Sequence, residues 1–197
     1  TLKAEPGVRA WVMPADLSQP GAAADLAAQM KRARRPIDVL VNNAGVLEHG
    51  PFIGMPAARH QQLIDLNISG LTALLAQFLP GMVAQGHGRV LNVASVAAFQ
   101  PIPMLATYAA GKAYVLSLSE SLSEELKGTG VRVGTIAPGT TETEIFDQLR
   151  ASGRAVPADK TPALQAADVA SAVRYMLEQP AHANVARMLL VSSAESV

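Results

Sequence analysis

Short apolar runs alternate with longer stretches of helical periodicity along this chain of 197 residues. The run at residues 37–41 is nearly continuous, which is typical of a parallel strand covered on both faces. The longer stretches repeat their apolar side chains every three to four residues, which indicates helices. The expected strands span residues 8–13, 37–41, 90–94, 131–137 and 188–191, and the expected helices span residues 21–34, 59–83, 107–127 and 167–178.

This order of elements predicts right-handed βαβ units and an α/β fold built on a mostly parallel sheet. Pro80 and Gly81 are expected to kink or end the second helix. Gly128 is a suitable residue to follow the third helix. Residues 140–160 are polar and irregular, with one short helical piece. No repeat or linker divides the chain, so we expect a single domain over residues 1–197.

Composition excludes several classes of protein. Apolar residues make up 49% of the chain and charged residues 16%, as in a soluble globular protein. Sixteen basic residues balance sixteen acidic ones, so no excess charge points to nucleic acid. There are no cysteines, and the four histidines are scattered, so we expect no metal site. No apolar run reaches the ~18 residues of a membrane span, and no signal peptide is evident, so a cytoplasmic protein is expected.

The stretch from Arg89 to Lys112 carries the candidate chemistry. Ser95 ends an apolar run, and Tyr108 and Lys112 stand four residues apart at the start of a helical pattern. Residues at this spacing share one helix face. A phenol has a pKa of ~10 in water, and a neighbouring ammonium favours phenolate. A serine facing this pair across a crevice could help to hold a carbonyl oxygen and pass it a proton.

Each of these residues also has a plain structural explanation. Tyrosine and lysine four apart occur by chance on many amphipathic helices, as a packed aromatic and a solvated charge. Ser95 taken alone is more typical of a turn. The catalytic interpretation therefore depends on the other motifs around the trio.

Those motifs, taken together, make the chain resemble the short-chain dehydrogenase/reductase family. They occur in the family's order and spacing over nearly the whole chain. They are Asp16-Leu17, Asn42-Asn43-Ala44-Gly45, Asn67, Ser95, Tyr108 with Lys112, and Pro138-Gly139 followed by Thr143. Structural explanations remain for some of them: Asn42 could stabilise a turn, and Asn67 could satisfy a helix carbonyl.

The resemblance implies a Rossmann-like fold and a set of catalytic roles. It makes Tyr108 the general acid-base and Lys112 the residue that lowers its pKa and binds the nicotinamide ribose. Ser95 would orient the substrate carbonyl, and Asn67 would hold a water that links Lys112 to solvent. The implied reaction interconverts a carbonyl and an alcohol on a small molecule.

The resemblance also implies an NADP or NAD cofactor and a homodimer or homotetramer. Asp16 and Leu17 would contact adenine, and Asn42, Ala44 and Gly45 would line the adenosine side. Pro138, Gly139 and Thr143 would lie by the nicotinamide. The helices at residues 59–83 and 107–127 are expected to form the contact between subunits.

One family element is not found in the sequence. The family's glycine-rich turn binds the cofactor pyrophosphate at a helix N-terminus, and no Gly-x-x-x-Gly-x-Gly occurs here. The first strand expected here corresponds to the family's third, so we expect an N-terminally incomplete sheet, with about 45 residues not represented. The strand at residues 37–41 should then be an open apolar edge. The choice between NAD and NADP cannot be read without that unit.

Two other functions are alternatives to this one. The chain could be a catalytically silent fragment that acts only as an association module. An epimerase or dehydratase of the family's extended relatives is disfavoured, because those need a longer C-terminal substrate domain.

Overall fold

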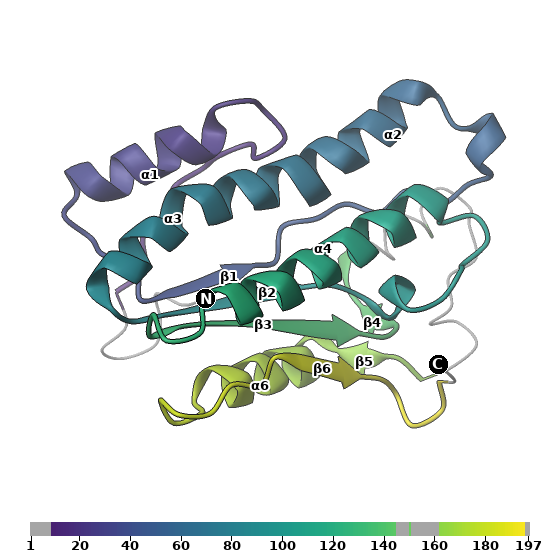
Figure 1. Ribbon diagram of the computed structural model, residues 1–197. Coiled ribbons are helices and arrows are strands. Elements are labelled where there is room, and N and C mark those ends of the chain that lie inside the picture. The colour runs from purple at the N-terminus through teal and green to yellow at the C-terminus, as the bar shows by residue number, and fades with distance from the viewer. Residues whose placement is uncertain (1–8, 145–149, 151–161, 196–197) are drawn as a thin grey trace.

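A four-stranded parallel sheet forms the centre of the computed structural model, which describes residues 9–144, 150 and 162–195 (Figure 1). Its strands follow the order β1-β2-β3-β6, and neighbours in this order are parallel. The prediction of a parallel α/β fold is therefore confirmed. The strands are β1 (Val39–Asn42), β2 (Gly88–Val93), β3 (Val131–Pro138) and β6 (Arg187–Leu190); β4 (Thr141–Glu142) and β5 (Leu164–Gln165) form a separate short parallel pair.

The predicted helices are all present, with ends that differ by a few residues. They are α1 (Ala22–Arg32), α2 (Ala57–Ile64) continued by a π segment (Asp65–Gly70) and α3 (Leu71–Gln85), α4 (Ala106–Glu125) and α6 (Ala166–Leu177). Two short 3₁₀ turns occur at Phe52–Gly54 and Val96–Ala98. Most of the irregular stretch expected at residues 140–160 lies outside the described residues.

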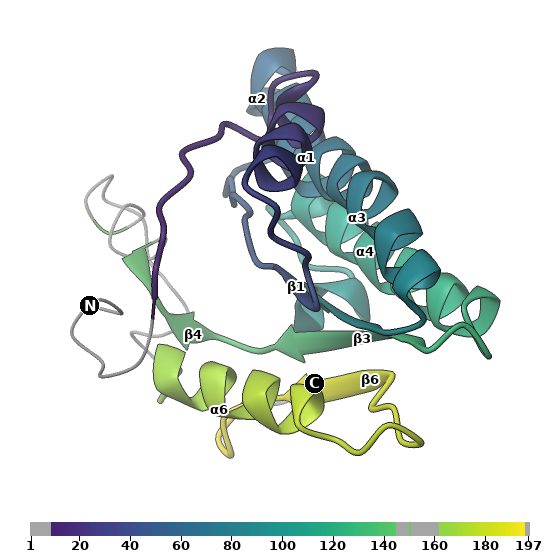
Figure 2. The same ribbon diagram turned by 90° about the vertical axis from the view of Figure 1, so that its left-hand side faces the viewer.

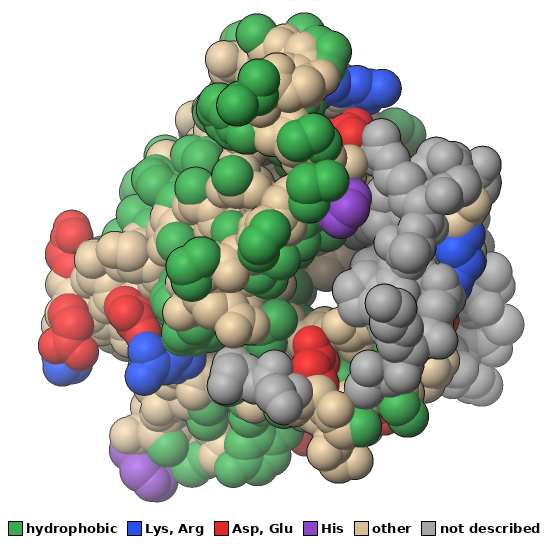
Figure 3. All heavy atoms as spheres, turned by 90° about the vertical axis from the view of Figure 1, so that its right-hand side faces the viewer, with side chains coloured by type: hydrophobic (Ala, Val, Ile, Leu, Met, Phe, Trp, Pro, Cys, Tyr) green, Lys and Arg blue, Asp and Glu red, His purple; other side chains and the backbone are tan. Residues whose placement is uncertain are grey.

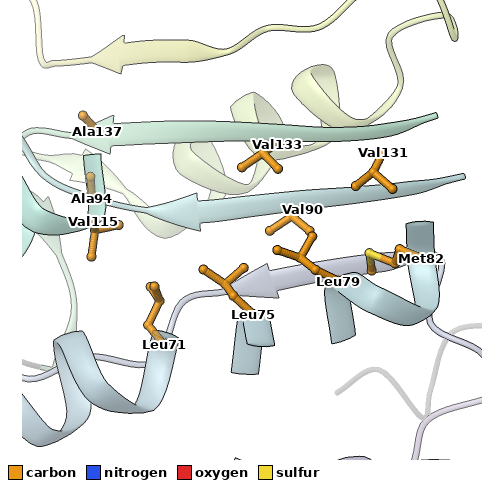
Figure 4. Packing of buried hydrophobic residues seen from close by; sticks show 10 residues of the cluster. All are labelled: Leu71, Leu75, Leu79, Met82, Val90, Ala94, Val115, Val131, Val133 and Ala137. Carbon is orange, nitrogen blue, oxygen red and sulfur yellow. The ribbon is translucent and has the colours of Figure 1, made fainter. Parts of the chain in front are cut away.

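Hydrophobic side chains cover both faces of the sheet. Leu75 and Leu79 of α3 pack with Val115 of α4 against Val90 on one face (Figure 4). Leu91 and Ile136 point to the opposite face, where Met176 of α6 packs. Alternation along β2 and β3 therefore supplies two separate cores, as expected for strands with period-two side chains.

The last crossover has a different hand from the first two. α3 and α4 lie on one side of the sheet and α6 on the other (Figure 2). Because the strand order advances in one direction, β3–α6–β6 winds opposite to β1–α3–β2 and β2–α4–β3. The expectation that all units are right-handed is wrong for this last unit.

The strand expected at residues 8–13 does not form over residues 9–13, the part of this range that the structure describes. Residues 9–13 have no regular structure, and Trp11 and Val12 are 57% and 80% exposed. A strand needs a neighbour to pair its N–H and C=O groups, and in the described residues β1 pairs with β2 alone. Val39 and Val41 are 42% and 40% exposed. β1 is thus the open apolar edge that was expected, and its run is not covered on both faces.

The long helix does not end at Pro80. The span Ala57–Gln85 is continuous and stops where Gly86 adopts φ 72°. Proline removes a hydrogen bond to the carbonyl four residues earlier, at Ala76. Both residues are exposed, so water can bond that carbonyl. By length and composition alone this span could cross a membrane, but α3 packs its leucines on the sheet as a core helix does.

Two neighbouring glycines offer a test of this packing. Gly128 and Gly130 both have left-handed backbone, at φ 82° and 81°. A Cβ at Gly128 would meet no atom within 4 Å, whereas one at Gly130 would lie 1.9 Å from the Gly86 carbonyl oxygen. We expect Gly128→Ala to lower the free energy of unfolding by about 1–2 kcal/mol through backbone strain. Gly130→Ala should cost about 1–3 kcal/mol more. Urea denaturation measures both, and equal losses would contradict the close approach.

Candidate active site

Seven of the predicted site residues line one cavity of about 510 Å³ at the carboxyl ends of the strands. This is where open α/β sheets place ligands. Apolar side chains of β2 and α6, including Val93, Val169 and Val173, form another part of its wall. The seven predicted residues are Gly45, Ser95, Tyr108, Lys112, Pro138, Gly139 and Thr143.

Lys112 is buried on α4, with 7% of its surface exposed. It shares the sheet-facing stripe of the helix with Val115 and Ser119. Its Nζ donates a hydrogen bond of 2.8 Å to the Val93 carbonyl oxygen. Burial disfavours the ammonium and lowers the pKa of Lys112 from 10.5 to about 8. The lysine is therefore held at a fixed point of β2 and can lose its proton near neutral pH.

Tyr108 and Ser95 share a hydrogen bond between their side chains. Ser95 also caps the turn Val96–Ala98, because its Oγ accepts from the Ala97 N–H at 3.2 Å. Burial raises the pKa of the Tyr108 phenol above its ordinary value, and the bond with Ser95 acts in the opposite direction. The expectation that Lys112 lowers this pKa is not met here. Lys112 Nζ lies 5.7 Å from the centre of the ring, and desolvation of the phenolate outweighs the bond with Ser95, so the net shift of the pKa is upward.

Asn67 lies in the π segment and holds the loop that follows β1. Its Oδ1 accepts from the Val46 N–H at 2.9 Å, and its Nδ2 donates to the Val46 carbonyl at 2.8 Å. A Cβ on Gly45 would lie 3.3 Å from Asn67 Oδ1 and 3.7 Å from Lys112 Nζ. The absence of a side chain at Gly45 thus keeps these two residues close together. The π segment, which often marks a functional site, was not anticipated from the sequence.

Of the residues expected on the adenosine side, Gly45 lines the cavity of the catalytic trio, and the others lie elsewhere. Leu17, Asn42 and Ala44 line a second groove of about 290 Å³ beside β1. The Asn42 amide is buried and donates to Asn92 Oδ1 at 2.8 Å. Asp16 is exposed, and its Oδ1 accepts from the N–H and hydroxyl of Ser18 at 3.1 and 2.6 Å. Donation by Ser18 lowers the pKa of Asp16.

Glu195 is a neighbour of the site that sequence reasoning missed. Its carboxylate accepts from the Thr140 N–H at 3.0 Å and from the Thr140 hydroxyl at 3.0 Å. It therefore braces the segment that follows Pro138-Gly139. The two residues are 55 positions apart, and no local pattern in the sequence could connect them.

Comparison with known proteins is consistent with this geometry. A family model described as short chain dehydrogenase matches residues 1–153. The chain is 37% identical over 174 residues to sulfoacetaldehyde reductase 2 of Chromohalobacter salexigens, covering 85% of this chain and 69% of the relative. It is 33% identical over 205 residues to the NADP-dependent 3-hydroxy acid dehydrogenase of Escherichia coli K12, covering 99% and 81%. The chain belongs to the short-chain dehydrogenase family.

Solved structures show the same likeness. The closed form of a serine dehydrogenase complexed with NADP⁺ matches with a TM-score of 0.88 and 30% identity, over 100% of this chain and 81% of that one. A metagenomic short-chain oxidoreductase in complex with NADP matches with a TM-score of 0.79 and 29% identity, over 96% and 76%. The chain spans 62% of the length of an uncharacterised oxidoreductase of Staphylococcus epidermidis.

The buried lysine leads to a prediction about stability and pH. The pKa of Lys112 is lowered on folding, so the unfolded chain binds its proton more tightly. Below pH 8 the buried ammonium costs about 3 kcal/mol, and this cost disappears as the pH rises to 10.5. Lys112→Met should therefore raise the free energy of unfolding at pH 7 by about 2 kcal/mol, after about 1 kcal/mol for the lost hydrogen bond.

Urea unfolding of both proteins at pH 7 and pH 10.5 measures this effect. Lys31→Met, at an exposed position of α1, is the control and should change stability by less than about 0.5 kcal/mol at either pH. A Lys112→Met variant that is less stable than the wild type at pH 7 would show that the ammonium is not buried at a cost.

Proposed function

We propose that the protein is an NAD(P)-dependent oxidoreductase that interconverts a carbonyl and an alcohol on a small molecule. The observation that carries this proposal is the convergence of Ser95, Tyr108 and Lys112 on one cavity at the carboxyl ends of the strands. Membership of the short-chain dehydrogenase family supports it. The names of several relatives, which include a reductase and two dehydrogenases, point the same way.

Ser95 and Tyr108 act on the reacting oxygen. A substrate carbonyl between their hydroxyl groups accepts a hydrogen bond from each, which stabilises the negative charge that develops during reduction. Tyr108 then gives its proton to that oxygen. The raised pKa keeps the phenol protonated beforehand, so it is ready to act as an acid. In the reverse direction Tyr108 removes the proton from the alcohol.

Lys112 assists this proton transfer through its charge. The ammonium stabilises the phenolate that forms as Tyr108 loses its proton. Since the pKa of Lys112 is about 8, this assistance weakens above that pH. The ammonium has donors left beyond its bond to Val93, and we assign them to the ribose hydroxyls of the cofactor.

The cavity suits a nicotinamide. Gly45 and Gly139 allow close approach of a ring, and Val93, Val169 and Val173 offer it an apolar wall. A bound nicotinamide supplies or accepts the hydride. We place the adenosine in the groove beside β1 that Leu17, Asn42 and Ala44 line. The given sequence contains no Gly-x-x-x-Gly-x-Gly that could hold the pyrophosphate between these two parts of the cofactor.

For the substrate we propose a short carbonyl compound with an acidic group. The named relatives act on sulfoacetaldehyde and on 3-hydroxy acids, and their identity to this chain exceeds 30%. A panel of short aldehydes and oxo acids, assayed with NADPH and NADH, tests the proposal. Oxidation of neither cofactor with any member would count against it.

A second candidate function is a silent association module. The open edge of β1 favours it, because the same edge is where the cofactor would need further support. Titration with NADPH and NADH separates the two candidates. We expect this chain to bind either cofactor only weakly, since it lacks backbone N–H groups for the pyrophosphate. A dissociation constant in the low micromolar range would refute this account of the cradle.

Tyr108→Phe should abolish carbonyl reduction in the active protein. The substitution removes the proton donor and leaves the ring, so we expect kcat to fall by about 10²- to 10⁴-fold. Cofactor affinity should be unchanged. Tyr114→Phe is the matched control, because this tyrosine lies on the same helix and its hydroxyl contacts Thr72 instead, at 2.9 Å. Similar turnover by both variants would refute the assignment of Tyr108.

We also propose that the protein self-associates through α2, α3 and α4. Ile64, Val83 and Tyr114 lie on these helices with more than a third of their surfaces exposed. In the view of Figure 3, hydrophobic side chains extend over the helical side of the molecule. Exposed apolar patches of this kind often mark contacts between proteins.

Light scattering at micromolar concentration tests this proposal. We expect a dimer or tetramer in the wild type. Replacing Val83 and Tyr114 by aspartate and lysine should produce monomers, because each charge would be buried at the contact. A wild-type protein that is monomeric at these concentrations would contradict the proposal.

A further inference from the structure

A row of buried polar side chains crosses three strands beneath α4. Asn42, Asn92 and Thr135 are direct partners in the register of β1, β2 and β3. Their exposed fractions are 6%, 0% and 0%. Because in-register residues point to the same face of a sheet, the row lies on the side covered by α3 and α4. None of these side chains reaches the cavity that holds the catalytic trio.

Hydrogen bonds connect this row to the helix that carries Tyr108 and Lys112. Asn42 Nδ2 donates to Asn92 Oδ1 at 2.8 Å, and Asn92 Nδ2 donates to Ser119 Oγ at 2.8 Å. The Ser119 hydroxyl in turn donates to the Val115 carbonyl at 2.6 Å. Ser119 is therefore satisfied both as donor and as acceptor, and its acceptor role ties α4 to the sheet.

Ser119 and Lys112 attach α4 to two adjacent residues of β2, Asn92 and Val93. Ser119 follows Lys112 by seven positions, which is about two helical turns, so both side chains face the sheet. Lys112 Nζ bonds the Val93 carbonyl, and Ser119 Oγ bonds the side chain of Asn92. A slip of one residue would turn the helix by about 100° and break both bonds. Apolar contacts at Val115 do not have this directionality.

Stability does not explain why this row is polar. Asn42 Oδ1 and Thr135 Oγ1 have no hydrogen-bond partner in the described part of the chain. The neighbours of the row on the same face are apolar, and Val90 and Val133 belong to the core there. An apolar row would avoid the cost of burying polar atoms. The geometry that the row imposes on α4 is what distinguishes it from an apolar row.

We propose that Ser119 and Asn92 are positioning residues for the catalytic reaction. They fix the rotation and the axial position of α4, and thereby place Lys112 at Val93 and Tyr108 at Ser95. This inference rests on the proposed oxidoreductase function. Misplacing a reacting group by about 1 Å can reduce the rate by about 10²-fold.

Three substitutions on α4 test the proposal in the active protein. Ser119→Ala removes the bond to Asn92 and should lower kcat by about 10- to 100-fold, with KM changed by less than about threefold. Ser121→Ala is the matched control, because Ser121 makes the same kind of bond to Ser117 at 2.9 Å but is exposed. Ser119→Thr keeps the hydroxyl and should restore most of the activity.

A titration of Tyr108 tests the placement without relying on turnover. The phenols of the three tyrosines can be followed by carbon NMR after ¹³C labelling, and Tyr108→Phe identifies the Tyr108 signal. Ser119→Ala should shift the pKa of Tyr108 relative to the wild type, and Ser121→Ala should not. If Ser119→Ala does not fold, Ser119→Cys keeps the side-chain volume with a weaker acceptor, and should give the same shift.

The outcomes separate this inference from the proposed function. An inactive wild type in which Ser119→Ala still moves the Tyr108 titration would refute the function and support the positioning role. An active wild type with unchanged kcat and unchanged Tyr108 titration in both Ser119→Ala and Ser119→Cys would overturn the positioning role, even if both variants melt at lower temperature.

Discussion

The burial of the Lys112 ammonium is the constraint on which the site depends. A charge at this depth is tolerated only where a fixed acceptor meets it, and the Val93 carbonyl provides that acceptor. Val93 is the last residue of β2, so the lysine is tied to the carboxyl edge of the sheet. This one bond brings the start of α4 over the strand ends, and Tyr108 and Ser95 then meet one turn away.

The surroundings of the trio are arranged to keep that placement. Asn67 holds the loop after β1 through both the oxygen and the nitrogen of its side-chain amide, and Gly45 leaves room between it and Lys112. Glu195 holds the segment after β3 from the other side. Loops that follow strands are usually the most variable parts of such folds. Here two of them are each fixed by a single polar side chain from an element that is distant in sequence.

The sequence predicted what depends on neighbours along the chain. The helices follow from apolar spacing, and Tyr108 and Lys112 could be paired because four residues bring side chains onto one helix face. Residues 9–13 do not form the strand expected there, because a strand needs a partner and the described residues supply none. The direction of the Tyr108 pKa failed for a similar reason, since desolvation depends on packing. Asn92, Ser119 and Glu195 act across segments that are distant in sequence, so no local pattern could identify them.

Because the β3–α6–β6 connection has the opposite hand, the proton-transfer residues of the cavity and its apolar wall come from opposite faces of the sheet. Its catalytic wall belongs to α4 and the core on one face of the sheet, whereas Val169 and Val173 come from α6 and the core on the other. The two cores share no residue among those the structure describes, and the sheet lies between them. Substitutions in α6 can therefore change which molecule the cavity admits while the proton-transfer residues stay in place. New substrate specificities can then evolve without loss of catalysis.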